Sequence, residues 1–129
     1  MSAIYVLDTH TLVWILEGNP KLSERAKQCV LHGAAQLVIP AIALAEACAM
    51  IQKQRTAITI PELTSALDAD VRFVVLALDK AIVLESQAFI SLSEMHDRLI
   101  VTSTKHVPGA TLITCDEEIR TVAGLTTIW

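Results

Sequence analysis

The sequence predicts an α/β domain in which a central, mostly parallel five-stranded sheet lies between helical layers as a three-layer sandwich. Short apolar segments rich in β-branched residues alternate with segments of helical periodicity along the 129 residues. The short segments are apolar on both faces, as in parallel strands that helices cover on both sides. The alternation of strands and helices implies crossover connections between parallel strands.

Two of the five predicted strands are followed by an aspartate. Asp8 comes directly after "AIYVL", and Asp116 comes two residues after "ATLIT". Ligands of parallel α/β sheets bind beyond the carboxyl ends of the strands, where the strand order reverses. We therefore expect both aspartates at the functional edge of the sheet. The predicted strands cover residues 3–7, 36–40, 72–78, 110–114 and 126–129.

Helical periodicity fills the segments between these strands. Gly18, Asn19 and Pro20 separate the first two helices, and Pro61 suits the first turn of another. The chain has no internal repeat and no flexible linker, which predicts a single domain over residues 1–129. The predicted helices cover residues 9–17, 22–33, 41–54, 61–69, 79–91 and 97–105, with a short one at 116–122.

The composition excludes several classes of protein. With 53% hydrophobic and 19% charged residues, the chain is not disordered. No apolar run reaches the roughly 18–20 residues that span a bilayer, and no signal peptide is visible, so we expect a cytoplasmic protein without membrane contact. The three cysteines have no metal-binding spacing and indicate reduced core thiols. The formal net charge of −4 argues mildly against nucleic acid, unless several carboxylates converge on cations.

Glu46 is the strongest single indication of a site. It lies in "VIPAIALAEACAMI" (38–51), in which every other residue is apolar or proline. An ionised carboxylate buried without a partner costs several kcal/mol, so Glu46 needs a cation or a proton unless it pairs with an arginine or lies on a narrow exposed stripe. For Asp8, Asp97 and Asp116, taken singly, helix capping is an equally good interpretation.

The four carboxylates together indicate a metal site at one edge of the sheet. Hard divalent ions such as Mg²⁺ and Mn²⁺ bind carboxylate oxygens and water, and the four histidines lack ligand spacing for a softer metal. Such ions orient a phosphodiester, lower the pKa of an attacking water and stabilise the leaving oxygen. The combination of Asp8, Glu46, Asp97 and Asp116 therefore predicts phosphoryl chemistry.

The sequence around these residues resembles the acidic motifs of PIN-domain ribonucleases, most closely the VapC-type toxins of bacterial toxin–antitoxin pairs. The matching segments are "VLDTHTLVW", "PAIALAEACAMI", "EMHDRLIVTST" and "LITCDEEI", and they cover nearly the whole chain. The resemblance implies a metal-dependent endoribonuclease with Mg²⁺ or Mn²⁺ in the acidic pocket. It also implies a homodimer and a small antitoxin whose tail covers the pocket.

Carried over by position, the resemblance assigns catalytic and metal-binding roles to Asp8, Glu46 and Asp97. Asp116 matches a fourth, more variable acidic position, and Thr114 matches a hydroxyl position that orients water or phosphate.

Where many relatives have an aspartate in "DPxD", this chain has Glu94 in "EMHD" without the proline, so Glu94 is given an auxiliary role only. We interpret His96 as structural rather than as a general acid.

Four basic residues are candidates for RNA binding. Lys53 follows Glu46 by seven residues and Lys105 follows Asp97 by eight, so each could share a helix face with the site. Arg55 and Arg98 lie nearby in sequence. Ordinary solvated charges are the alternative interpretation for all four.

The same residues fit three other functions less well. In a phosphotransfer receiver domain Asp79 could be the phosphoacceptor, but the acidic pair after the first strand and the lysine after the last are missing. A phosphatase of the haloacid dehalogenase type needs an aspartate where His10 stands. A catalytically inactive module that binds protein or RNA with the same fold is the alternative from a different class, and the presence of all four carboxylates argues against it.

Overall fold

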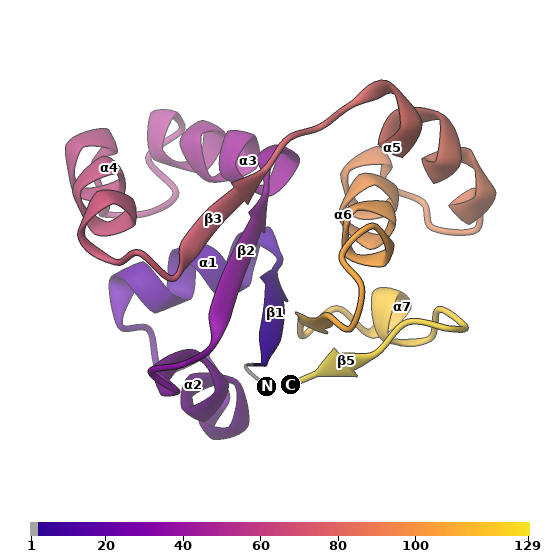
Figure 1. Ribbon diagram of the computed structural model, residues 1–129. Coiled ribbons are helices and arrows are strands. Elements are labelled where there is room, and N and C mark those ends of the chain that lie inside the picture. The colour runs from indigo at the N-terminus through magenta and orange to yellow at the C-terminus, as the bar shows by residue number, and fades with distance from the viewer. Residues whose placement is uncertain (1–2) are drawn as a thin grey trace.

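The computed structural model describes residues 3–129 as three layers, with a sheet between two groups of helices (Figure 1). The five strands lie in the order β3-β2-β1-β4-β5, and every neighbouring pair is parallel. The predicted fold class is therefore confirmed. The strands are β1 (Ile4–Leu7), β2 (Gln36–Pro40), β3 (Phe73–Leu76), β4 (Thr111–Ile113) and β5 (Thr127–Ile128).

The chain adds strands on one side of β1 and then on the other. The helices up to α4 lie on one side of the sheet, and α5, α6 and α7 lie on the other (Figure 1). The strand order therefore reverses between β1 and β4, which makes their carboxyl ends the switch point of the sheet. The helices are α1 (Thr9–Glu17), α2 (Glu24–Leu31), α3 (Ala41–Gln52), α4 (Ile60–Ala69), α5 (Lys80–Glu85), α6 (Met95–Lys105) and α7 (Glu117–Arg120), with a 3₁₀ turn at Ser86–Phe89.

The three central strands form the core. Their side chains are buried on both faces because helices cover both sides of the sheet. The fully buried residues of these strands include Val6, Leu7, Leu37, Ile39, Leu112 and Ile113.

None of the helices within residues 3–129 is long and apolar enough to cross a membrane.

The edge strand β3 departs from the prediction. It was expected to be buried on both faces, but Val74 and Val75 are 41% and 46% exposed. The strand pairs only with β2, and the pairing stops where Leu76 lies opposite Pro40. An edge position and a short partner therefore explain both the exposure of β3 and its end before residue 78.

Two helix boundaries differ from those that the sequence pattern predicts. The predicted helix over 79–91 ends at Glu85 and continues as a 3₁₀ turn, because the hydroxyl of Ser86 donates to the carbonyl of Val83 at 2.6 Å. The last long helix, α6, begins at Met95 and not at Asp97. Asp97 consequently lies inside the first helical turn.

Candidate active site

Asp8 lies between β1 and α1, and only 6% of its surface is exposed. Its Oδ1 accepts a hydrogen bond from the backbone N–H of Thr11 at 2.9 Å, which caps α1. Burial raises the pKa of Asp8, and hydrogen bonding by Thr114 and Thr11 opposes that rise. The capping interpretation is thus correct for Asp8, although the same side chain also borders a cavity.

Asp116 has the matching position after β4. Its Oδ1 accepts hydrogen bonds from the backbone N–H groups of Glu118 at 2.9 Å and Ile119 at 3.1 Å, which cap the short helix α7. The Oγ1 of the fully buried Thr114 accepts the N–H of Asp116 at 3.1 Å. Thr114 therefore lies behind the aspartates, where it shapes the turn, and it is not among the residues that line the cavity.

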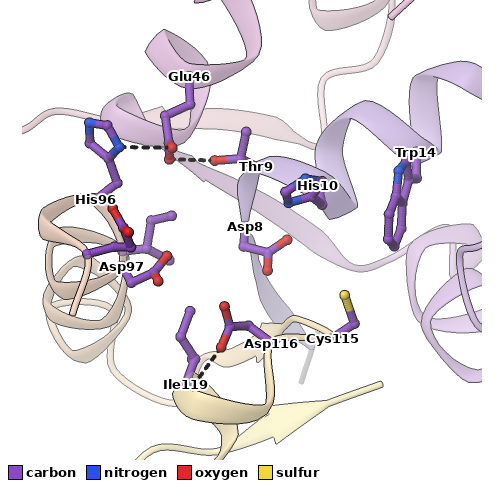
Figure 2. A pocket seen from close by; sticks show the side chains of 12 residues that line it. Asp8, Thr9, His10, Trp14, Glu46, His96, Asp97, Cys115, Asp116 and Ile119 are labelled. Carbon is purple, nitrogen blue, oxygen red and sulfur yellow. Dashed lines mark hydrogen bonds and ion pairs between the residues drawn. The ribbon is translucent and has the colours of Figure 1, made fainter. Parts of the chain in front are cut away.

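Glu46 projects from the middle of α3 toward two hydrogen-bond donors. Its Oε1 accepts from Thr9 Oγ1 at 2.8 Å, and its Oε2 lies 3.0 Å from Nδ1 of His96 (Figure 2). The side chain is 28% exposed, so it is neither fully buried nor paired with an arginine. Thr9 begins α1 and His96 lies in α6, and both of these helices pack against α3.

Asp97 is a carboxylate on whose ionisation both burial and the other carboxylates of the cavity act. It is half-buried in the first turn of α6, and no hydrogen bond to its carboxylate is found within residues 3–129. Burial and then the carboxylates of Asp116, Glu46, Asp8 and Glu94 raise the pKa of Asp97 to about 6. The dipole of α6 favours a negative charge at this position, but burial and the neighbouring acidic groups outweigh it.

All of these carboxylates line one cavity of about 430 Å³. Figure 2 shows Asp8, Asp97 and Asp116 around the same space, with Glu46 above them. Five carboxylates border the cavity, and no lysine or arginine of residues 3–129 does. The chain has 14 acidic and 10 basic residues, so its acidic excess is concentrated here and the remaining surface is almost balanced. The lining residues are Asp8, Thr9, His10, Trp14, Glu46, Glu94, His96, Asp97, Ile100, Cys115, Asp116 and Ile119.

The chemistry of this donor set fits a hard divalent cation. Carboxylate oxygens without a basic counter-ion repel one another, and a divalent ion offsets that repulsion. Within residues 3–129, however, no group of three His, Cys, Asp or Glu side chains lies close enough together to hold one ion. The carboxylates thus surround a common space without forming a closed coordination shell.

The four basic residues predicted to bind RNA lie outside the cavity. Arg98 donates from Nε to the carbonyl of Leu92 at 2.7 Å. Lys105 Nζ lies 3.5 Å from the carbonyl of Ala123 and 5.5 Å from the centroid of the Phe89 ring.

Arg98 and Lys105 therefore bond nearby backbone, and neither forms an ion pair with an acidic side chain of residues 3–129. Lys53 and Arg55 are exposed beyond the end of α3, and their role in RNA binding stays a prediction.

Several residues of the cavity were not predicted from the sequence. The position of Thr9 directly after Asp8 is the one feature of the sequence that could have indicated it. Cys115 was interpreted as a core thiol, but it lines the cavity, where burial and then Asp8 and Asp116 raise its pKa. Trp14 and Ile119 lie on the cavity wall as well.

The fold and the cavity together define a class: a parallel three-layer α/β domain with a carboxylate-lined site at the switch point of its sheet. The chain belongs to the PIN domain family, whose sequence profile matches residues 5–125. No match was found among curated proteins. The receiver-domain alternative is excluded by topology, because that fold has the strand order 2-1-3-4-5 and here β3 is at the edge.

Solved structures with a similar fold include VapBC proteins and a toxin–antitoxin complex. The chain is similar to VapBC2 from Rickettsia felis bound to a promoter DNA fragment, with a TM-score of 0.72, 16% identity and 97% of each chain covered. It is also similar to a toxin–antitoxin complex from Klebsiella pneumoniae, with a TM-score of 0.68, 21% identity and coverage of 98% and 97%. A third similar structure is VapBC-1 from nontypeable Haemophilus influenzae, with a TM-score of 0.67 and 21% identity; the match covers 97% of this chain and 96% of that one.

Proposed function

We propose that this PIN domain is an endoribonuclease that depends on Mg²⁺ or Mn²⁺. The observation that carries the proposal is the cavity at the switch point, with five carboxylates and no lysine or arginine of residues 3–129 on its wall. A phosphodiester is itself anionic, so it approaches these carboxylates only together with a cation. Asp8, Glu46, Asp97 and Asp116 would hold that ion.

The chain's own residues prepare the site in two ways. Asp8 and Asp116 cap α1 and α7, and the backbone N–H groups that donate to them fix both side chains before any ligand binds. Glu46 and Asp97 come from α3 and α6 on the other wall of the cavity. A bound divalent ion would supply an activated water and stabilisation of the leaving oxygen. Glu94, at the cavity rim, adds negative charge in an auxiliary role.

RNA cleavage by Asp97→Asn tests the proposal, with Asp79→Asn as the matched control. Asp79 caps α5 outside the cavity, and asparagine can still cap. We expect Asp97→Asn to reduce cleavage in Mn²⁺ by about 10²–10³-fold, the scale of losing one electrostatic group of a site. Asp79→Asn should retain activity, and EDTA should stop the wild type.

The product ends report which nucleophile attacks. Attack by water leaves 5′-phosphate and 3′-hydroxyl ends, whereas attack by the ribose 2′-hydroxyl leaves a 2′,3′-cyclic phosphate. Cleavage that persists in EDTA, or cyclic phosphate products, would contradict the metal-dependent mechanism. Full activity of Asp97→Asn would remove that residue from the site, and no cleavage by the wild type would favour an inactive binding module.

We also infer that the protein is the toxin of a toxin–antitoxin pair and forms a homodimer in the cytoplasm. The similar structures described as VapBC and toxin–antitoxin complexes support this assignment, and the free thiols of Cys29, Cys48 and Cys115 fit a reducing compartment. Expression of the chain alone should arrest bacterial growth. Co-expression of a small protein encoded beside it should restore growth, and Asp97→Asn should not be toxic.

A further inference from the structure

We propose that His96 is a positioning residue, which together with Thr9 holds the Glu46 carboxylate at the cavity for cation binding. The inference rests on the proposed function, because it assigns a role toward the divalent ion. It revises the interpretation of His96 as merely structural. His96 touches neither substrate nor reacting atoms in this assignment, and it acts only through Glu46.

The contacts around Glu46 occupy both of its oxygens. Thr9 Oγ1 lies 2.8 Å from Oε1, and Nδ1 of His96 lies 3.0 Å from Oε2. A carboxylate only accepts hydrogen bonds, so Nδ1 must carry the hydrogen. Both the neutral Nδ1–H tautomer and the imidazolium meet this condition. Each carboxylate oxygen has a second lone pair, so the two bonds leave Glu46 able to bind a cation.

The surroundings explain why Glu46 needs to be held. Its side chain is 28% exposed, so it has a route to solvent, and the other carboxylates of the cavity repel it in that direction. No lysine or arginine of residues 3–129 lines the cavity to oppose the repulsion. Thr9 and His96 are the two described donors to Glu46. They therefore keep in the cavity a carboxylate that would otherwise rotate outward.

His96 also joins two elements of the site. It precedes Asp97 in the first turn of α6, and its ring reaches across to α3 (Figure 2). One short segment thus supplies a candidate ligand, Asp97, and the donor that fixes another, Glu46. Hydrogen bonds to ligating carboxylates generally contribute to metal affinity, with losses of about 10–100-fold when the partner is removed.

Mn²⁺ binding to His96→Phe and His96→Asn tests the role without reference to catalysis. Phenylalanine keeps the ring but removes the donor, and the side-chain N–H₂ of asparagine can replace Nδ1–H. We expect His96→Phe to raise the Mn²⁺ dissociation constant at least about tenfold, measured by EPR spectroscopy of free Mn²⁺. His96→Asn should return it to within about threefold of the wild type on the same scale.

His106 offers a matched control at the other end of the same helix. It caps α6 and pairs with Glu85, away from the cavity, so His106→Phe also breaks an imidazole–carboxylate pair. That variant should leave Mn²⁺ affinity unchanged. Melting temperatures in EDTA show whether each variant is folded. Should His96→Phe not fold, tighter binding by His96→Asn than by His96→Gln, whose amide sits one methylene farther out, supports the proposal.

Two results would overturn the assignment while leaving the proposed function intact. One is equal Mn²⁺ affinity of His96→Phe and the wild type. The other is tighter binding by His96→Phe, which would mean that His96 competes with the ion for Glu46. Absence of Mn²⁺ binding by the wild type would overturn both this inference and the proposed function.

Discussion

At the scale of single residues, helix capping and cation binding are compatible uses of one carboxylate. Asp8 and Asp116 each accept their capping hydrogen bonds through Oδ1, and each side chain also lines the cavity. The cap fixes the side-chain torsions, so less conformational entropy is lost when a ligand binds. An aspartate directly after a buried strand is therefore suited to both functions.

Asp97 predicts how stability without metal depends on pH. Its pKa is about 6 in the folded protein and about 4 in the unfolded chain, so folding favours the protonated form. This contribution to stability is present below about pH 4 and is lost as the pH rises through about 6. Because the residue is half-buried, solvent screening reduces the effect to about 1 kcal/mol.

Asp97→Asn should consequently be more stable than the wild type in EDTA at pH 7 and equally stable at pH 4. For a chain of this size the difference at pH 7 corresponds to about 3–5 °C in melting temperature. Thermal melts from pH 4 to 8 measure it, and Asp79→Asn serves as the control because Asp79 lies outside the cavity. A variant that is destabilised at pH 7 would show that the Asp97 charge stabilises the fold.

The sequence was sufficient to pick out the acidic residues that line the cavity but not their hydrogen-bond partners. Asp8 and Asp116 follow strands, and the ends of adjacent parallel strands must meet, so their proximity was predictable. Glu46 stood out because its segment is otherwise apolar. The contact between Glu46 and His96 depends on how α3 packs against α6, which no local pattern encodes.

At the scale of elements, α6 shows why helical periodicity does not place a basic residue at the cavity. Lys105 follows Asp97 by eight residues, which places it about 80° around the helix and, at 1.5 Å per residue, about 12 Å farther along the axis. Periodicity gives the face of a helix and not the depth along it. The same limitation applies to Lys53, about 10 Å beyond Glu46 on α3.

Arg98 supports the segment before α6, which predicts an effect on stability. Its guanidinium donates to the carbonyl of Leu92 at 2.7 Å and to that of Ile90 at 3.4 Å. Arg98→Met keeps much of the aliphatic stem and removes these charged donors. We expect a loss of about 1–3 kcal/mol in the free energy of unfolding, measured by urea denaturation in EDTA.

Lys53→Met is the comparison, because Lys53 is exposed and makes no side-chain hydrogen bond within the described part of the chain. Its stability should stay within about 0.5 kcal/mol of the wild type. If Lys53 contacts RNA, Lys53→Met should weaken RNA binding while leaving stability unchanged. Equal stability of the two variants would show that the Arg98 contacts are energetically unimportant.

At the scale of the whole molecule, the acidic excess is concentrated in the cavity beside β1 and β4. Seven of the ten large apolar side chains that are exposed within residues 3–129 come from one stretch of the chain, residues 71–90, which includes β3 and α5. A monomer rarely exposes a large contiguous apolar patch, and an unpaired strand edge favours association. The exposed residues of this segment are Val71, Val74, Val75, Leu78, Val83, Leu84 and Ile90.

We therefore predict that the homodimer buries part of this segment and that Leu84→Glu disrupts it. Leu84 is 59% exposed, so the substitution should not disturb the core of the monomer, but a carboxylate buried at an interface is costly. Light scattering should give the wild type twice the chain mass of 14.0 kDa and the variant a mass close to the monomer. Leu31→Glu is the control for the α5 side of this segment, because Leu31 is 67% exposed on α2, far across the molecule from α5 (Figure 1). A monomeric wild type at high concentration would refute the dimer, and equal masses for both variants would place its interface elsewhere.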